Sequence, residues 1–133
     1  MHYVYKDKIT GDLIRVLPGL YPSRLSENAL NELSIEKELY IVFFPLFYAH
    51  KKGIVQRVGR HVVENYEKPQ FMRSKHMIRG EFMGWHIIDT YTWQRQLVRN
   101  LTKDQMKLSP WGLWNDTLLI ERLLEGWLPE NWH

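Results

Sequence analysis

Four histidines in the middle of the chain are the residues best suited to acid–base or metal chemistry. They are His50, His61, His76 and His86, and their separations of 11, 15 and 10 residues match no established ligand spacing for a metal. Histidines on strands are more often partly packed, with one ring nitrogen hydrogen-bonded. We therefore predict no metal site, no cofactor and no catalytic residue.

Two carboxylates keep a catalytic alternative open. Asp89 lies three residues after His86 and would orient its imidazole if the chain turns between them. Glu64 is a second acidic partner for a histidine. The alternative is a hydrolase or nuclease that uses His61, His76 or His86 together with one of these acids.

Other motifs that carry chemistry are missing from the sequence. It has no phosphate-binding glycine loop, dinucleotide fingerprint, paired-histidine zinc helix, calcium loop or nucleophile elbow. It also has no cysteine, which excludes disulfide frameworks, thiolate metal sites and cysteine nucleophiles. These absences favour a non-catalytic protein.

Basic residues concentrate in one segment. Residues 51–79 contain eight Lys and Arg against two Glu, a charge of +6 in a chain whose net charge is +3. Phosphate binding needs several cations on one surface, and aromatic rings among them can stack on bases. The segment has three interpretations: a solvated loop, a contact with nucleic acid or a nucleoprotein, and a contact with an acidic protein. The candidate binding residues are Lys51, Lys52, Arg57, Arg60, Tyr66, Arg73, Lys75 and Arg79.

We expect a small intracellular, cytoplasmic binding protein, an inhibitor or accessory factor that acts on nucleic-acid machinery through this basic surface. Its partner is then a protein or a nucleoprotein, and direct DNA or RNA binding is the alternative. No membrane partner is expected, because the longest apolar run, residues 39–49, is half the length of a membrane helix of about 20 residues. The N-terminus lacks a signal-peptide pattern. The oligomeric state is left open.

The length of 133 residues and the hydrophobic content of 44% are typical of one globular domain, so we expect a single domain over residues 1–133. Strand patterns come first along the chain and helix patterns come last. This order predicts an α+β fold, with one antiparallel sheet of about 4–5 strands and short helices, mainly C-terminal, packed on it.

The expected strands are rich in β-branched and aromatic residues. Pro45 interrupts one of them, so we expect a bulge or a sheet edge there. Residues 64–80 are polar and basic without a period, and a loop of this length is often functional. The strands are residues 2–17, as a hairpin that turns at Thr10-Gly11, residues 39–49 and 54–63, joined by a turn at 51–53, and residues 82–88.

The expected helices are marked by residues that begin or end helices. Ser26 is predicted to cap a helix that ends near Ser34. The later helices begin at Asp89 or Thr90 and cover residues 93–101, at a capping box of Thr102 with Gln105, and at Ser109-Pro110, and a last helix over residues 118–124 stops at Gly126.

Four tryptophans surround the last helix. We expect this helix to dock on the sheet, and the alternative is that Trp111, Trp114 and Trp127 form an apolar patch for a partner. Trp132 is expected to be the most exposed of the tryptophans, because chain ends are poorly held.

Overall fold

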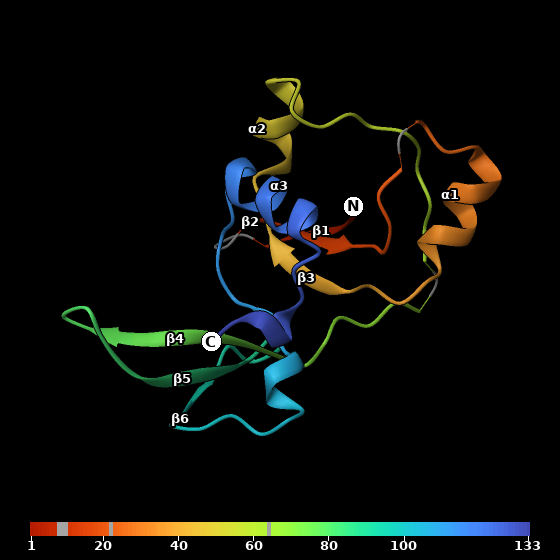
Figure 1. The fold of residues 1–133 in the computed structure, drawn as a ribbon. Helices are drawn as coiled ribbons and strands as arrows, with labels where there is room; N and C mark the ends of the chain where they lie inside the picture. The colour runs from red at the N-terminus through yellow and green to blue at the C-terminus, as the bar shows by residue number, and fades with distance from the viewer. Residues whose placement is uncertain (8–10, 22, 64) are drawn as a thin grey trace. The chain divides into compact units, whose positions relative to one another are not determined.

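The computed structural model describes residues 1–7, 11–21, 23–63 and 65–133 (Figure 1). Contacts divide the chain into two compact units: unit 1 contains Met1–Tyr66 and Leu113–Trp127, and unit 2 contains Glu67–Gly112 and Leu128–His133. The predicted α+β class is confirmed. Two sheets, of three and four strands, replace the expected single sheet of about 4–5 strands. A single domain over residues 1–133 remains a prediction.

The sheet of unit 1 is antiparallel and has the order β1-β2-β3. The predicted N-terminal hairpin is confirmed, whereas its predicted turn residue Thr10 lies outside the described residues. All four residues of the third strand are buried and form the core with Leu13, Ile14 and Val16. The strands are β1 (His2–Asp7), β2 (Gly11–Val16) and β3 (Tyr40–Phe43).

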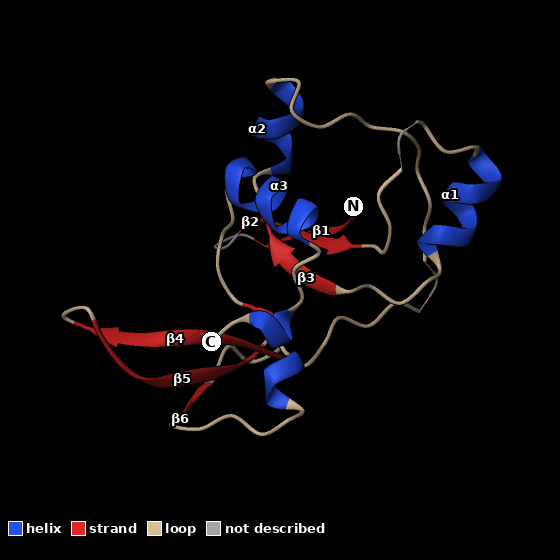
Figure 2. Cartoon of the chain, in the orientation of Figure 1, coloured by secondary structure: helices blue, strands red, loops and turns tan. Residues whose placement is uncertain are grey.

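Among the described residues, unit 1 contains three α-helices (Figure 2). Ser26 caps the first, as predicted, because its Oγ accepts a hydrogen bond from the N–H of Ala29 at 3.2 Å. Asn115 caps the last, which ends at Gly126 in the left-handed conformation with φ +65°. The helices are α1 (Glu27–Ser34), α2 (Leu46–Lys51) and α3 (Asp116–Glu125).

The strands predicted over residues 39–49 and 54–63 need correction. β3 ends at Phe43, because Pro45 has no N–H to donate to the ladder and instead precedes the first turn of α2. Residues 54–63 form no strand. Val58 and Val62 would lie on the same face of a strand, but they are 42% and 74% exposed. The segment therefore buries no apolar face of the kind that holds a strand in register.

Aromatic rings connect β3 with the two ends of α3. The ring of Tyr40 lies 5.7 Å from that of Trp114 and 5.3 Å from that of Trp127, between centroids. Both tryptophans are buried, and the N–H of Trp114 donates to the carbonyl of Phe43 at 2.8 Å. The last helix is therefore anchored beside the sheet, and these two tryptophans form no exposed patch. Burial raises the pKa of Tyr40 to about 12.

The sheet of unit 2 has the order β6-β5-β4-β7. β4 and β5 are antiparallel, as are β5 and β6, and the short β7 lies parallel to β4. β5 confirms the strand predicted over residues 82–88. The described part of the unit consists of β4 (Phe71–Ile78), β5 (Glu81–Asp89), β6 (Arg95–Val98), β7 (Ser109–Pro110) and the 3-10 helices η1 (Gln105–Lys107) and η2 (Pro129–Asn131).

Local turns explain where the predictions for unit 2 were wrong. The expected loop over residues 64–80 contains β4, which returns as β5 through Arg79-Gly80; their φ angles of 51° and 80° suit a type I′ hairpin turn. No helix begins at Asp89 or Thr90, and none covers residues 93–101. The Oδ1 of Asp89 accepts hydrogen bonds from the N–H groups two and three residues later, and the chain returns as β6. Ser109-Pro110 forms β7 instead of starting a helix.

The capping box predicted at Thr102 and Gln105 is present before η1. The N–H of Thr102 donates to the Gln105 side chain at 3.0 Å, and the N–H of Gln105 donates to the Thr102 hydroxyl at 3.2 Å. The predicted capping box is therefore confirmed, although the helix that it begins is a single 3-10 turn.

A buried arginine holds the irregular parts of unit 2 against its sheet. Arg73 of β4 is 0% exposed, and its Nη2 lies 3.1 Å from the carbonyl oxygen of Met106, 2.6 Å from that of Pro129 and 3.1 Å from that of Trp132. Its guanidinium carbon lies 4.3 Å from the ring centroid of Trp85 and 4.9 Å from that of Trp132. Burial lowers the pKa of Arg73 to about 10, so the side chain stays cationic at neutral pH.

The same contacts explain the position of Trp132. This tryptophan was expected to be exposed, but it is half-buried, and its ring meets that of Trp85 edge-on at 5.0 Å. A ring that covers a buried cation gains cation–π attraction in addition to apolar burial. Residues 128–133 are therefore held in place by side chains of the sheet.

We expect Arg73→Met to destabilise the protein by about 2 kcal/mol, because methionine keeps the volume but removes the three hydrogen bonds that Nη2 donates to main-chain carbonyls. The carbonyl of Pro129 keeps its bond from the N–H of Trp132. Arg99→Met is the matched control, since Arg99 is exposed. Urea unfolding followed by tryptophan fluorescence and circular dichroism measures both variants. Equal stability of the two would contradict the role given to Arg73.

Candidate binding surface

The eight candidate binding residues do not belong to one unit. Five lie in unit 1 and three in unit 2. The basic segment crosses from one compact unit to the other after residue 66, so its two halves are considered separately. Unit 1 holds Lys51, Lys52, Arg57, Arg60 and Tyr66, and unit 2 holds Arg73, Lys75 and Arg79.

Three of the eight side chains are buried or half-buried and form hydrogen bonds inside their own unit. Arg73 is buried and is removed from the candidate surface. Lys75 is half-buried, and its Nζ donates to the main-chain oxygen of His133. Tyr66 is also half-buried, and its hydroxyl donates to Oε1 of Glu38 at 2.9 Å. Arg79, in contrast, is exposed in the turn between β4 and β5.

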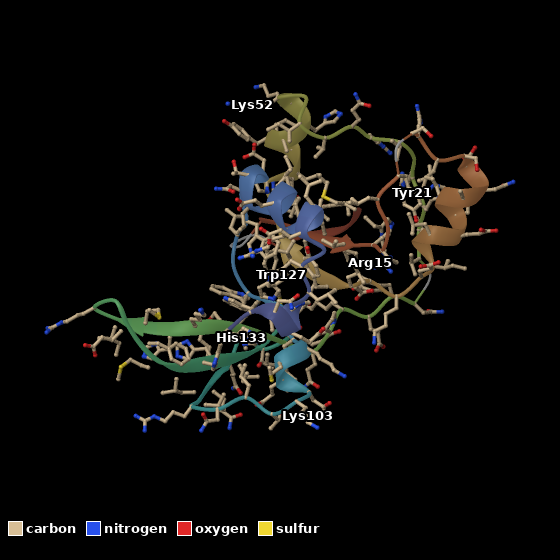
Figure 3. The ribbon with its side chains drawn as sticks, in the orientation of Figure 1. Arg15, Tyr21, Lys52, Lys103, Trp127 and His133 are labelled. Carbon is tan, nitrogen blue, oxygen red and sulfur yellow. The ribbon has the colours of Figure 1, made fainter. Side chains whose placement is uncertain are left out.

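The cations at the end of α2 lie beside exposed aromatic rings. Lys51 and Lys52 are exposed, and Figure 3 labels Lys52 where its side chain projects from the end of the helix. Phe47 and Tyr48 are 76% and 53% exposed, and Nζ of Lys52 lies 4.6 Å from the ring centroid of Tyr48. We define these four residues together with His50 as the α2 surface. Sequence reasoning missed the two rings, because it placed them in a buried strand.

The charge around the α2 surface is of one sign. The sequence has no Asp or Glu between Glu38 and Glu64, whereas Lys51, Lys52, Arg57 and Arg60 fall in this interval. The buried Ala49 anchors the helix on its inner side. Basic residues in the last turn of a helix also interact favourably with its dipole, so part of this pattern stabilises α2 itself.

Arg57 and Arg60 lie in the irregular segment that follows α2. Both are exposed. Arg60, His61 and Val62 line a depression of about 440 Å³ together with residues of α1 that include Glu32. This acidic residue makes the depression mixed in charge, and it is less suited to phosphate than the α2 surface.

The four central histidines do not converge. His50 lies on α2 and His61 beside α1, whereas His76 and His86 face each other across β4 and β5 with ring centroids 4.5 Å apart. Desolvation, and then the neighbouring His76 and Arg95, lower the pKa of His86. The two-histidine pair is the part of the predicted set that the structure brings together.

The acids considered for catalysis are placed less favourably. The carboxylate of Asp89 accepts hydrogen bonds from the main chain of its own turn and from Gln70, and these bonds lower its pKa. Asp89 lies three residues after His86 on β5. Because side chains alternate between the two faces along a strand, these two side chains lie on opposite faces of the sheet. Glu64 lies outside the described residues.

His61 and Tyr66 contribute to a buried polar cluster around Arg15. The guanidinium of Arg15, 2% exposed, contacts Oε2 of Glu38 at 3.2 Å. His2 donates from Nε2 to the main-chain oxygen of His61 at 2.7 Å, and its Nδ1 accepts from Arg15 at 3.2 Å. Because the carbonyl can only accept and the guanidinium can only donate, these contacts require a neutral His2.

Comparison of the chain with protein-family models, curated proteins and solved structures finds no match. In the described ranges, no three His, Asp or Glu side chains are placed to hold a metal ion together. None of the helices in these ranges has the length and apolar composition that a membrane crossing requires. The α2 surface is therefore judged on its geometry alone.

The polar cluster predicts a loss of stability in acid. Desolvation and then Arg15 hold the pKa of His2 below its ordinary value of 6.5, partly offset by the bond to His61. As the pH falls below this ordinary value the unfolded chain takes up a proton before the folded one, so stability decreases. We expect urea midpoints to fall between about pH 7 and about pH 5, and to fall less in His2→Gln.

The control for this experiment is His50→Gln, which changes an exposed histidine of α2. It is expected to keep the pH dependence of the unaltered protein. A His2→Gln protein with the same pH dependence as the control would show that His2 is not the titrating group.

Proposed function

We propose that this chain is a non-catalytic binding protein, an inhibitor or accessory factor of nucleic-acid machinery, and that its α2 surface contacts the phosphate-bearing partner. One observation carries the proposal: the short helix α2 exposes two rings, Phe47 and Tyr48, and ends in exposed lysines, of which Lys52 lies over the ring of Tyr48, in a part of the sequence without carboxylates.

This combination of side chains suits a nucleic acid or a nucleoprotein. Lysine neutralises phosphate, and aromatic faces stack on unpaired bases at little cost in sequence preference. An exposed phenylalanine such as Phe47 has no hydrogen-bonding group of its own, so a base or another ring is a better partner for it than water. A purely solvated charged surface would not need these rings.

The charges of unit 1 give the proposal a further basis. Unit 1 contains ten Lys and Arg and ten Asp and Glu, so its net charge is zero. The α2 surface is therefore a local concentration of cations and not a consequence of overall charge. Attraction to phosphate depends on such a local field, and it weakens with added salt.

The first test is the affinity for single- and double-stranded DNA and RNA at low and moderate salt. Lys51→Ala combined with Lys52→Ala is expected to weaken binding and to lower the slope of log affinity against log salt by about 2. The matched control is Lys103→Ala combined with Lys107→Ala, which removes the same charge from exposed residues of unit 2. Equal losses in both would show attraction by net charge alone, and no salt-sensitive binding would overturn the proposal.

A second prediction separates stacking from charge. Phe47→Leu keeps an apolar side chain but removes the aromatic face, so binding to single strands should weaken by about 1–3 kcal/mol. Binding to duplexes, whose bases are already stacked, should change little. Fluorescence anisotropy with matched labelled strands measures both. A loss shared equally by single strands and duplexes would contradict stacking on Phe47.

A further inference from the structure

β4 is paired along its whole length on one side but only in part on the other. β5 pairs with residues 71–78, whereas β7 reaches only Met72 and Arg73. The chain leaves this edge after Trp111, at Gly112 with φ +154°, a backbone conformation that residues with a side chain rarely adopt. Within the described part of the chain, no strand continues β7 along residues 74–78 (Figure 1).

The hydrogen bonds around β4 show which main-chain groups face this open edge. The carbonyl of Arg73 accepts from the N–H of Trp111 on the β7 side. Main-chain groups of alternate residues point to the same side of a strand, so those of Lys75 and Met77 also face outward. On the β5 side, the bond from the N–H of Thr90 to Gln70 fits the same alternation. The edge therefore offers two N–H donors and two carbonyl acceptors.

The side chains at this edge are apolar between cations. Met77 and Ile78 are 49% and 47% exposed, although they belong to β4, whose register with β5 shifts by one residue between His76 and Met77. Lys75 precedes them and Arg79 follows them. Proteins usually protect an edge strand by covering it, twisting it away or placing a charge on it, and here the register shift beside Met77 and the exposed Arg79 contribute to the protection.

We propose that the open edge of β4, residues 74–78, binds an extended acidic segment of another protein as an added β-strand. The main-chain bonds would come from Lys75 and Met77, as in other complexes formed by strand addition. Apolar residues of the incoming strand would lie beside Ile78, on one face of the sheet. Its carboxylates would lie near Lys75 and Arg79.

Charge argues against a second copy of the chain at this edge. Unit 2 holds eight Lys and Arg against five Asp and Glu, so all of the net charge of +3 is in this unit. An antiparallel pair of β4 strands centred on His76 would bring Lys75 and Arg79 of both copies into one interface. Like charges at an interface are unfavourable, whereas an acidic strand is attracted.

This inference is independent of the proposed function, because it concerns a different unit and a different class of partner. The α2 surface would contact phosphates, and the β4 edge would contact a peptide main chain. Variants of the β4 edge should therefore leave nucleic-acid binding unchanged, so failure of one proposal does not decide the other.

The test uses a fluorescein-labelled synthetic peptide of alternating Val and Glu, with a Val and Lys peptide as its charge-reversed counterpart. We expect saturable binding of the acidic peptide and at least about tenfold weaker binding of the basic one. Met77→Pro removes one outward N–H without removing a bond to β5, so it should weaken binding about tenfold. Met77→Ala keeps the N–H and serves as the matched control.

Two further measurements keep the result decisive. Amide hydrogen exchange should slow at Lys75 and Met77 when the acidic peptide binds. If Met77→Pro does not fold, the unaltered protein is tested with an acidic peptide whose amides are N-methylated along one edge, which removes the same bonds. Binding of that peptide as tight as of the unmethylated one would overturn the proposal.

Other outcomes also overturn it. These are no binding of the acidic peptide up to about 1 mM, equal binding of the acidic and basic peptides, and equal affinity of Met77→Pro and Met77→Ala. Sedimentation that shows a dimer in the unaltered protein and a monomer in Met77→Pro would assign the edge to a second copy instead.

Discussion

Each unit of this protein encloses a buried guanidinium, and main-chain carbonyls from helical turns and from the residues beside them converge on it. In unit 1, Arg15 donates to the carbonyl of Ser34, the last residue of α1, at 2.9 Å and to that of Glu36 at 2.5 Å. In unit 2, Arg73 holds three carbonyls from residues 106–132. Burial of a cation is unfavourable unless other groups compensate it. Arg15 is compensated by Glu38 and by these carbonyls. Arg73 is compensated through Nη2 and the rings of Trp85 and Trp132, because its buried Nε and Nη1 have no hydrogen-bond partner in the described part of the chain. The strands could form without them, but the connecting segments would lose their position.

Local signals in the sequence were sufficient where one residue decides the structure. The cap at Ser26, the helix end at Gly126 and the apolar strand β5 all follow from their own residues. Arg73 could not be foreseen in the same way, because its charge indicates exposure and only distant carbonyls make burial favourable. Arg73 is also the reason why β4 was not predicted. Its position in the strand faces inward, and a charged residue there interrupts the apolar alternation that identifies a strand.

The sequence predicts the lysines of the α2 surface but not its aromatic rings. Lys51 and Lys52 were recognised from charge alone, and both are exposed. Phe47 and Tyr48 were hidden in an apolar run, and it is Pro45 that ends the buried strand just before them. The boundary between the units falls after Tyr66, inside the basic segment, where neither composition nor charge changes. A run of charge in a sequence therefore does not define one surface.

Both units are discontinuous along the chain, since each includes residues beyond position 112. During synthesis the hairpins of β1–β2 and β4–β5 can pair as soon as they leave the ribosome, because their contacts are local. Trp114 and Trp127 emerge much later, and so do the carbonyls that Arg73 requires. Until then Tyr40 and Arg73 lack their partners, and neither unit can complete its core. Both cores therefore stay incomplete until residues 113–133 have been synthesised, and their exposed apolar surface is a binding site for chaperones during that time.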